Sequence, residues 1–588
     1  MWSRHALSRI RLLASAGCVA IGWVVVEKSI FAQCGCAGSR NGGSRDGTVC
    51  EFAEVNTKDF GTTGEASGEN AQPRFARALA VLPLGQTTRI NVGQYRFDIS
   101  GVNARGPIEL IGEGAGAGPG AVLNDHCSQI LPNYAKGDAV RVGPSLFGST
   151  FRDFQINSNV GQRTSGAGIR LDATGLNSVV MNYRIENVAF NNQFYDIQTQ
   201  QGGMGTIENT YHQAWRQDAI HSAGDGIHEG QSGFVTANVF FGDTSASNSQ
   251  NSGIYTQNGY GRFFNNLILG AQVGVRNYTA EFPNGGFEVV SNWLEEQDQS
   301  GVYMFQGNGQ TATLAAINWN EFSVATLGGA ARRNFRSHIT IGPGTPAYWL
   351  TDFQIVGNRM RTTAASGGTN AFIQVRGGQY GIVQDNVLEG LGGNTTNGIT
   401  VGGAANAANI AILDNQVHGD FTNRYSIANS TVMFRDFSSN LTAAEITALT
   451  VHDGSLAWAE DGRPGSNPLR GGGPGCIAIR EGGVWKGKAP QTSVKRTNLT
   501  SYTVVDTDTS LSFYGGATAS IRLPTPSSYI GRELIVKTEG GVRTVSASLN
   551  VIPLTGGTTP GTAILQAVPG KWVMLKSDGA NWVVMMGN

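Results

Sequence analysis

Two glutamates, a tryptophan and two arginines stand at matching positions after a regularly spaced asparagine. They are Trp293, Glu295, Glu321, Arg359 and Arg361. Strand spacing of about 4.8 Å, with about 6.7 Å for two residues, would hold the two glutamate backbones about 8 Å apart. Carboxylates at such a separation serve as acid and base in inverting glycosidases. The tryptophan suits stacking on a sugar ring, and the arginines suit an anionic group.

A second group of titratable residues lies upstream. Asp218, Asp225 and Glu229 fall close to His221 and His228, and together they could bind a cation or act as acid and base. The alternative for both groups is structural. Outward strand residues are polar in any solenoid, Glu–Arg pairs on adjacent strands are routine, and the second group also fits a polar turn.

The elements that would hold these side chains follow from a repeat. An apolar residue stands three positions before an asparagine and another stands two positions after it. The seven anchors are Asn238, Asn266, Asn292, Asn320, Asn358, Asn386 and Asn415. Their steps are 28, 26, 28, 38, 28 and 29 residues, so we expect a loop inserted around 327–346.

This period predicts coils of short strands stacked into a solenoid with one continuous apolar interior. We expect the asparagine at the turn, in left-handed backbone, with its amide bonding along the axis. The second residue after each asparagine points inward, and the first and third point outward. A β-sandwich would space its strands at about 8–12 residues and show no coil-length period.

The composition agrees with an all-β chain. Charged residues are only 14%, against roughly 25% in an average domain, and glycine is 82 of 588 residues. The formal net charge is -1 and no basic run occurs, which excludes the electrostatic footprint of a nucleic-acid binder.

The N-terminus predicts export. Three arginines precede an apolar run at 12–26, and Ala32 follows as a small residue, the layout of a signal peptide. Fifteen apolar residues are too few to span a bilayer, and no other long apolar run occurs. We therefore expect no transmembrane helix in the mature chain, although the sequence leaves open whether the signal is cleaved. Cys34 or Cys36 with Cys50 is the favoured disulfide in the segment that follows.

The segment Val55–Gly61, with Gly64 and Phe75–Leu79, resembles the start of pectate-lyase superfamily proteins. There an extended strand and a short capping helix lead into a right-handed parallel β-helix, so the resemblance implies this fold for about 50–440. Residues 65–70 depart from the family's Gly-Asp-Gly and paired Asp. The polygalacturonase signatures are absent, so no catalytic residue is carried over from that branch.

The composition changes after residue 440. Thr442-Ala-Ala-Glu445 predicts a capped short helix, and Gly482-Gly483 predicts a hairpin turn. Residues 493–588 alternate apolar and polar, which is typical of a small antiparallel β domain. Its end, Leu575 to Trp582, resembles C-terminal modules of phage tail fibres and tailspikes, which implies an attachment module.

The predicted organisation is a signal peptide (1–32), a Gly/Cys-rich segment (33–50), a parallel β-helix with an N-terminal capping helix (51–440), a helix and hairpin linker (441–490) and a small β domain (491–588). The predicted location is secreted, periplasmic or at the cell surface. The predicted partner is an extracellular polysaccharide, cleaved by hydrolysis or β-elimination. The alternative is a non-catalytic glycan-binding attachment protein.

The expected catalytic residues are Glu295 and Glu321, with Asp218, Asp225 and Glu229 in reserve. Trp293, Arg359 and Arg361 are expected to bind substrate. We expect no metal site and no cofactor, unless the protein is a lyase that uses a calcium ion. The sequence leaves open whether the chain forms a homotrimer.

Overall fold

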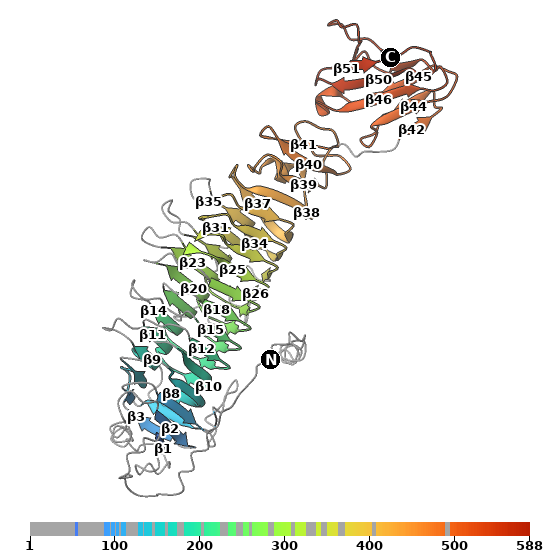
Figure 1. Cartoon of the computed structure of the whole chain (residues 1–588). Helices are drawn as coiled ribbons and strands as arrows, with labels where there is room; N and C mark the ends of the chain where they lie inside the picture. The colour runs from blue at the N-terminus through green and yellow to red at the C-terminus, as the bar shows by residue number, and fades with distance from the viewer. Residues whose placement is uncertain are drawn as a thin grey trace, which may run out of the picture. The chain divides into compact units, whose positions relative to one another are not determined.

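The structure is a computed structural model (Figure 1). It describes residues 53–56, 88–93, 96–99, 102–104, 108–112, 114, 128–132, 134–143, 148–158, 163–172, 182–200, 205–223, 233–242, 251–257, 261–279, 287–306, 312–324, 337–342, 350–362, 371–402, 407–488 and 494–588. The expected signal peptide, the Gly/Cys-rich segment with its disulfide, and the capping helix lie outside these residues, as do Asp225 and Glu229.

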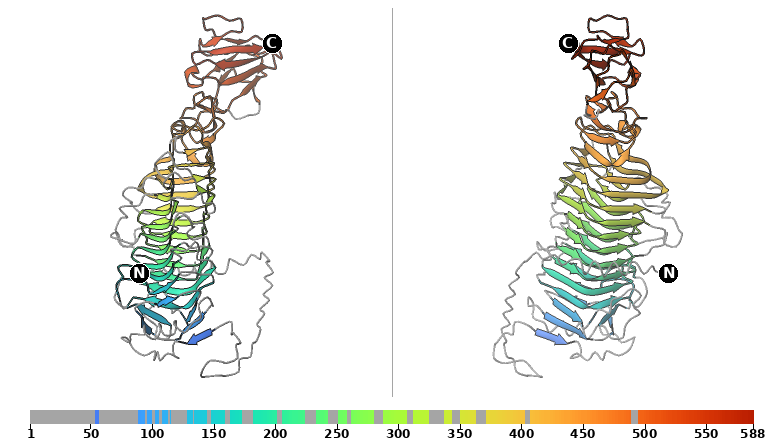
Figure 2. Two further views of the ribbon diagram at one scale, coloured as in Figure 1. Left: turned by 60° about the vertical axis from the view of Figure 1, so that its left-hand side comes forward. Right: turned by 90° about the vertical axis from the view of Figure 1, so that its right-hand side faces the viewer.

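The chain folds as a right-handed parallel β-helix followed by a small β domain. Parallel strands stack coil on coil in three ladders (Figures 1 and 2). Ladder A consists of β1 (Ala53–Asn56), β2 (Thr88–Gly93), β5 (Ile108–Gly112), β8 (Thr150–Asn157), β10 (Tyr183–Asn191), β12 (Gly205–Glu208), β15 (Phe234–Thr236), β18 (Gly261–Phe264), β21 (Phe287–Val290), β25 (Ala315–Asn318), β29 (Gln354–Val356), β33 (Ile382–Gln384), β36 (Ala411–Leu413), β38 (Met433–Leu441) and β39 (Leu456–Ala459). The predicted coil repeat is thus confirmed.

Ladder B follows the asparagines. It consists of β3 (Arg96–Ile99), β6 (Gln129–Pro132), the second halves of β8 and β10, then β13 (Tyr211–Gln213), β16 (Val239–Phe241), β19 (Leu267–Leu269), β22 (Trp293–Glu295), β26 (Glu321–Val324), β30 (Arg359–Thr362), and the starts of β34 (Val387–Val401) and β37 (Gln416–Ile427).

Ladder C closes each coil. It consists of β4 (Val102–Ala104), β7 (Val140–Val142), β9 (Ala167–Asp172), β11 (Tyr195–Gln200), β14 (Asp218–Ala223), β17 (Ser252–Gln257), β20 (Val273–Thr279), β23 (Ser300–Gln306), β27 (Ser337–Ile341), β31 (Ile373–Val375), and the ends of β34 and β37. Four two-residue strands pair at another bend: β24 (Ala312–Thr313), β28 (Leu350–Thr351), β32 (Gly378–Gln379) and β35 (Ala407–Ala408).

The seven repeat asparagines form a buried hydrogen-bonded column between ladders A and B. Each backbone N–H and each side-chain amide from Asn238 to Asn386 donates to the Oδ1 of the next asparagine, at 2.8–3.1 Å. We expected the asparagine itself to be left-handed, and this was wrong. The left-handed residue is the one before it, with φ of 50–67° from Ala237 to Asp414. The asparagine instead turns inward because its amide bonds along the axis.

The interior is apolar, as the register predicts. The second residue after each anchor is fully buried in all seven coils: Phe240, Ile268, Leu294, Phe322, Met360, Leu388 and Val417. Apolar residues of ladders A and C complete the same core, including Ile317, Ile355, Ile220 and Ile254.

The segment after residue 440 packs onto the last coils. Helix α3 (Ala443–Thr447) has the predicted capping box of Thr442 and Glu445. Strands β40 (Cys476–Glu481) and β41 (Val484–Gly487) pair antiparallel, with Gly482 and Gly483 at positive φ in the turn. Segment 441–490 was expected to be a linker, but its buried side chains, such as Leu469 and Trp485, join the core of the coils.

The C-terminal domain has a core of its own. Its elements are β42 (Lys495–Thr497), β43 (Ser501–Thr503), β44 (Ser510–Phe513), β45 (Ala519–Arg522), the 3₁₀ turn η3 (Pro526–Ser528), β46 (Glu533–Thr538), β47 (Thr544–Ser546), β48 (Val551–Ile552), β49 (Ala563–Leu565), β50 (Trp572–Ser577) and β51 (Trp582–Gly587). Antiparallel pairing, which was expected throughout, is found for β46–β50, β50–β51 and β47–β49, whereas β42–β44–β46 and β43–β45–β47 are parallel.

Candidate functional site

The outward residues of ladder B lie in the predicted register. Trp293 pairs with Glu321 and Glu321 with Arg359, while Glu295 pairs with Ser323. We call Trp293, Glu295, Glu321, Arg359 and Arg361 the carboxylate strip. The two glutamates are one coil apart and offset by two residues, as the sequence predicted.

The environment of Glu295 favours its protonated form. Burial raises the pKa of this carboxyl above its ordinary value, and the negative charge of Glu321 raises it further, while a hydrogen bond with Ser323 partly offsets both effects. Beside it, Trp293 is partly buried, and its indole Nε1 has no hydrogen-bond partner among the described residues. A carboxyl with a raised pKa next to a second carboxyl is an arrangement that can transfer protons at a glycosidic bond.

The two arginines of the carboxylate strip already have an acidic neighbour. Arg359 Nη2 lies 3.5 Å from Glu389 Oε1, and Arg361 Nε lies 3.7 Å from Glu389 Oε2. Both arginine side chains are more than half exposed, so water screens these pairs and each contributes little to stability. A substrate anion would therefore compete with Glu389 for the same guanidinium groups.

Among the reserve acids, Asp218 is the one that the structure describes. It is buried in β14, and its Oδ2 lies 2.8 Å from His221 Nδ1. Its other oxygen, Oδ1, is buried with no hydrogen-bond partner among the described residues. A buried carboxylate bonded to one imidazole nitrogen fixes the ring and leaves the other nitrogen, Nε2, to exchange a proton.

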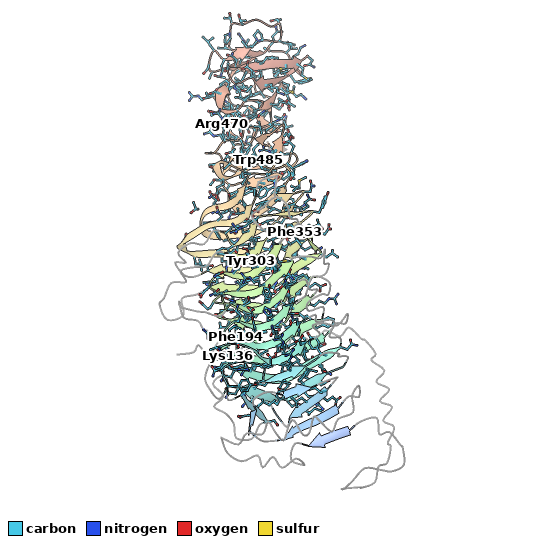
Figure 3. The ribbon with its side chains drawn as sticks, turned by 90° about the vertical axis from the view of Figure 1, so that its left-hand side faces the viewer. Lys136, Phe194, Tyr303, Phe353, Arg470 and Trp485 are labelled. Atoms are coloured by element: carbon cyan, nitrogen blue, oxygen red, sulfur yellow. The ribbon has the colours of Figure 1, made fainter. Side chains whose placement is uncertain are left out.

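His221 belongs to an outward column of ladder C. Its register partners on successive coils are Tyr255, Arg276 and Tyr303, the last of which is labelled in Figure 3. The imidazole stacks on Tyr255 at 4.8 Å between ring centroids and contacts the ring of Tyr195 at 4.6 Å. Arg276 lies over the ring of Tyr303, 5.7 Å from its centroid, and makes no ion pair with any described residue.

Burial and charge favour the protonated form of Tyr255 and of Tyr195, whose ring contacts His221. Burial raises the pKa of Tyr255 to about 12, the charge of Asp218 adds to the effect, and Arg276 opposes it. Burial likewise raises the pKa of Tyr195, again with a contribution from Asp218. We call Asp218, His221, Tyr255 and Arg276 the histidine column: it combines an oriented imidazole, a protonated phenol and a guanidinium on three successive coils.

Sequence reasoning quoted His221 but missed Tyr255 and Arg276. The asparagine repeat does not fix the register of ladder C, because the asparagines lie between ladders A and B. A signal does exist for four coils: a small residue and then a β-branched one precede His221, Tyr255, Arg276 and Tyr303, as in Gly253-Ile254-Tyr255 and Gly274-Val275-Arg276. At Gly274 a larger residue would not fit, since a Cβ there would lie 2.5 Å from Leu294 Cδ2 of the interior and 2.7 Å from the backbone oxygen of Gly301.

Within the described residues, no three His, Cys, Asp or Glu side chains are grouped so that they could hold a metal ion. In the same part of the chain, we find no helix with the length and apolar character that crossing a bilayer requires.

Similarity to known proteins was found among solved structures. No protein-family model and no curated protein matches the sequence. Solved structures that are similar include the Streptococcus pneumoniae surface protein and adhesin PfbA, at 15% identity and a TM-score of 0.42 over 65% of this chain and 99% of that one. The mannuronan C-5 epimerase AlgE4 A-module of Azotobacter vinelandii is 14% identical, with a TM-score of 0.45 over 65% and 99%.

DFA-IIIase from Arthrobacter chlorophenolicus A6, in complex with GF2, is 13% identical, with a TM-score of 0.45 over 64% of this chain and 98% of that one. At this similarity, the role of this chain has to be argued from its own residues.

Proposed function

We propose that this chain is an exported protein that binds an acidic extracellular polysaccharide and cleaves it by β-elimination at the histidine column. One observation carries the proposal: His221, Tyr255 and Arg276 lie in register on neighbouring strands, with Asp218 bonded behind the imidazole. Strands about 4.8 Å apart hold the outer two residues about 10 Å apart, roughly the span of a sugar ring with its substituents.

Each member has a role that follows from its chemistry. Arg276 holds the carboxylate of a uronic acid residue. It neutralises the negative charge that develops on this carboxylate when C5, the carbon that bears it, loses its proton. His221 takes that C5 proton at Nε2 while Asp218 stabilises the imidazolium that forms. Tyr255, kept protonated by its raised pKa, donates its proton to the departing glycosidic oxygen at C4. The C4–O bond breaks and a C4–C5 double bond forms.

The test is an assay of the mature chain on acidic and neutral polysaccharides, with calcium and with a chelator. Elimination produces unsaturated ends that absorb in the ultraviolet. His221→Ala and Tyr255→Phe should each lower turnover by about 10²–10⁴-fold, the usual contribution of positioned acid–base catalysis. Thr340→Ala, at the same register position two coils beyond Arg276, is the control; because Thr340 is buried and bonded to Ser337, its thermal midpoint is measured together with its turnover. Full elimination activity in His221→Ala would contradict the proposal.

A second candidate is hydrolysis at the carboxylate strip, favoured by the raised pKa of Glu295 beside Glu321. Glu295 would protonate the leaving oxygen and Glu321 would activate water, while Trp293 stacks on a ring and Arg359 and Arg361 bind an anionic group. The same assay separates the two reactions. Hydrolysis gives reducing ends without ultraviolet absorbance, and the double variant Glu295→Gln/Glu321→Gln abolishes it.

Binding without either product would instead support the non-catalytic attachment protein. The secreted, periplasmic or surface location is part of the same proposal, and finding the native chain in the cytoplasm would count against it. Sedimentation of the mature chain tests the homotrimer.

A further inference from the structure

The residue directly before each asparagine of the column has left-handed backbone, and in one coil this residue is of an unsuitable type. In the other coils this position holds Ala, Asn, Ser, Gly or Asp, but the coil of Asn320 has Trp319 at φ 55°. Left-handed backbone is unfavourable for a bulky side chain. Burial does not compensate, because Trp319 remains 64% exposed. Backbone strain of this kind is concentrated at ligand sites.

The glycine on the next coil makes room for this tryptophan. Position 357 does not need glycine for its φ of 67°, because Ser291 and Asp385 hold the equivalent position at φ 56° and 53°. It needs glycine for space. A Cβ on Gly357 would lie 2.5 Å from Cδ1 and 2.7 Å from Nε1 of Trp319. The indole therefore lies against the bare backbone of Gly357, and much of its surface remains open to solvent.

The neighbouring polar groups indicate what would stack there. Asp385 continues the same column one coil beyond Gly357, is exposed, and accepts a hydrogen bond from Gln384 Nε2 at 2.9 Å. At about 4.8 Å per coil, its carboxylate lies within reach of hydroxyl groups on a ring stacked over Trp319 and Gly357. The next acid along the column, Asp414, is paired with Arg435. An open aromatic surface beside a hydrogen-bond acceptor suits a neutral sugar ring.

The opposite bend of ladder A repeats the pattern. Leu314 and Tyr380 are also left-handed, with φ of 59° and 54°, and they are 59% and 58% exposed. Bulky exposed residues in left-handed backbone thus border both sides of the outer face of β25, β29 and β33. Tyr380 offers a second aromatic ring to a chain that crosses this face.

We propose that Trp319, lying over Gly357 with Asp385 beside it, is a binding platform for a neutral polysaccharide. It does not depend on either reaction proposed above. Its role is to hold the protein on a hydroxyl-rich chain, whereas the histidine column acts on an acidic sugar.

The experiment measures retention of the full mature chain on neutral polysaccharides (xylan, mannan and β-glucan) and on polygalacturonate by affinity electrophoresis. Trp319→Asn restores the residue type found at Asn265, and Gly357→Asn displaces the indole. Either change should weaken binding to the neutral polysaccharide that retains the unmodified chain, by about two- to tenfold, the range expected for an aromatic contact. Phe234→Asn, at an exposed aromatic of ladder A in ordinary backbone, should leave retention unchanged.

The thermal midpoint of Trp319→Asn should stay level or rise, since the change relieves left-handed strain, and a marked fall would mean that the indole is a packing residue. Equal retention of all variants, or no retention of the unmodified chain on any neutral polymer, would overturn the proposal. A loss of self-association in Trp319→Asn would show that the occupant is a second copy of this chain, which also overturns it. Activity on soluble acidic oligosaccharides reports the histidine column separately.

Discussion

Replacing Asn292 by alanine should destabilise the solenoid strongly, because this side chain bonds to the coils on both sides of it. Its Oδ1 accepts from the backbone N–H and the side-chain amide of Asn266, at 3.0 and 2.9 Å. Its Nδ2 donates to Phe263 O at 2.8 Å and to Asn320 Oδ1 at 3.0 Å. The site is buried, so water does not replace these partners.

The magnitude follows from the groups left unpaired. Alanine orphans the backbone N–H of Asn266 and one of its amide hydrogens, and each buried orphan costs about 1–3 kcal/mol. The loss of stability should therefore be on the order of 4 kcal/mol, several times the typical point mutation. Ser291→Ala is the matched control: the residue is exposed, and alanine already holds the equivalent left-handed position at Ala237.

Urea unfolding of the mature chain, followed by circular dichroism, measures both variants. Ser291→Ala should stay within about 0.5 kcal/mol of the unmodified chain. A loss below about 1 kcal/mol in Asn292→Ala, at an unchanged slope, would refute the view that the asparagine column holds the coils together.

Further predictions concern the core, the carboxylate strip, the buried thiol and the C-terminal domain. Leu294→Asp places a charge in the fully buried interior and should cost several kcal/mol or prevent folding, so a soluble variant of normal stability would contradict the register. Any hydrolytic activity requires protonated Glu295 and should fall as pH rises through its raised pKa. Ser323→Ala removes the bond that lowers this pKa, so the alkaline limb should move to higher pH; an unmoved limb would exclude Glu295 as the acid. Cys476 is buried, with its pKa raised to about 12, so Cys476→Ala should not change the number of thiols that react in the native chain. We also propose that residues 491–588, which have their own core, fold alone; a fragment without a cooperative melting transition would argue against this boundary.

The structure agrees most closely with the sequence-based predictions where a residue type at a given spacing can make only one kind of contact. Asparagine at a coil-length period set the register of ladder B, because a buried amide can bond to the coil above and below only if every coil presents it at the same place. From that register, the inward position of Leu294 and the outward positions of Glu295 and Glu321 followed by strand alternation alone. The Thr442 to Glu445 capping box was equally local, and it is present.

Tertiary structure decided what depends on groups distant in the chain. The histidine column joins β14, β17 and β20, and nothing in the spacing of His221, Tyr255 and Arg276 aligns them, because the loops between ladders vary in length. The pairing of Arg359 and Arg361 with Glu389, the packing of Leu469 and Trp485 into the solenoid, and the mixed pairing of the C-terminal domain are likewise contacts across coils or strands. Local pattern determined which face each residue takes; only the stacking of coils determined which residues meet on that face.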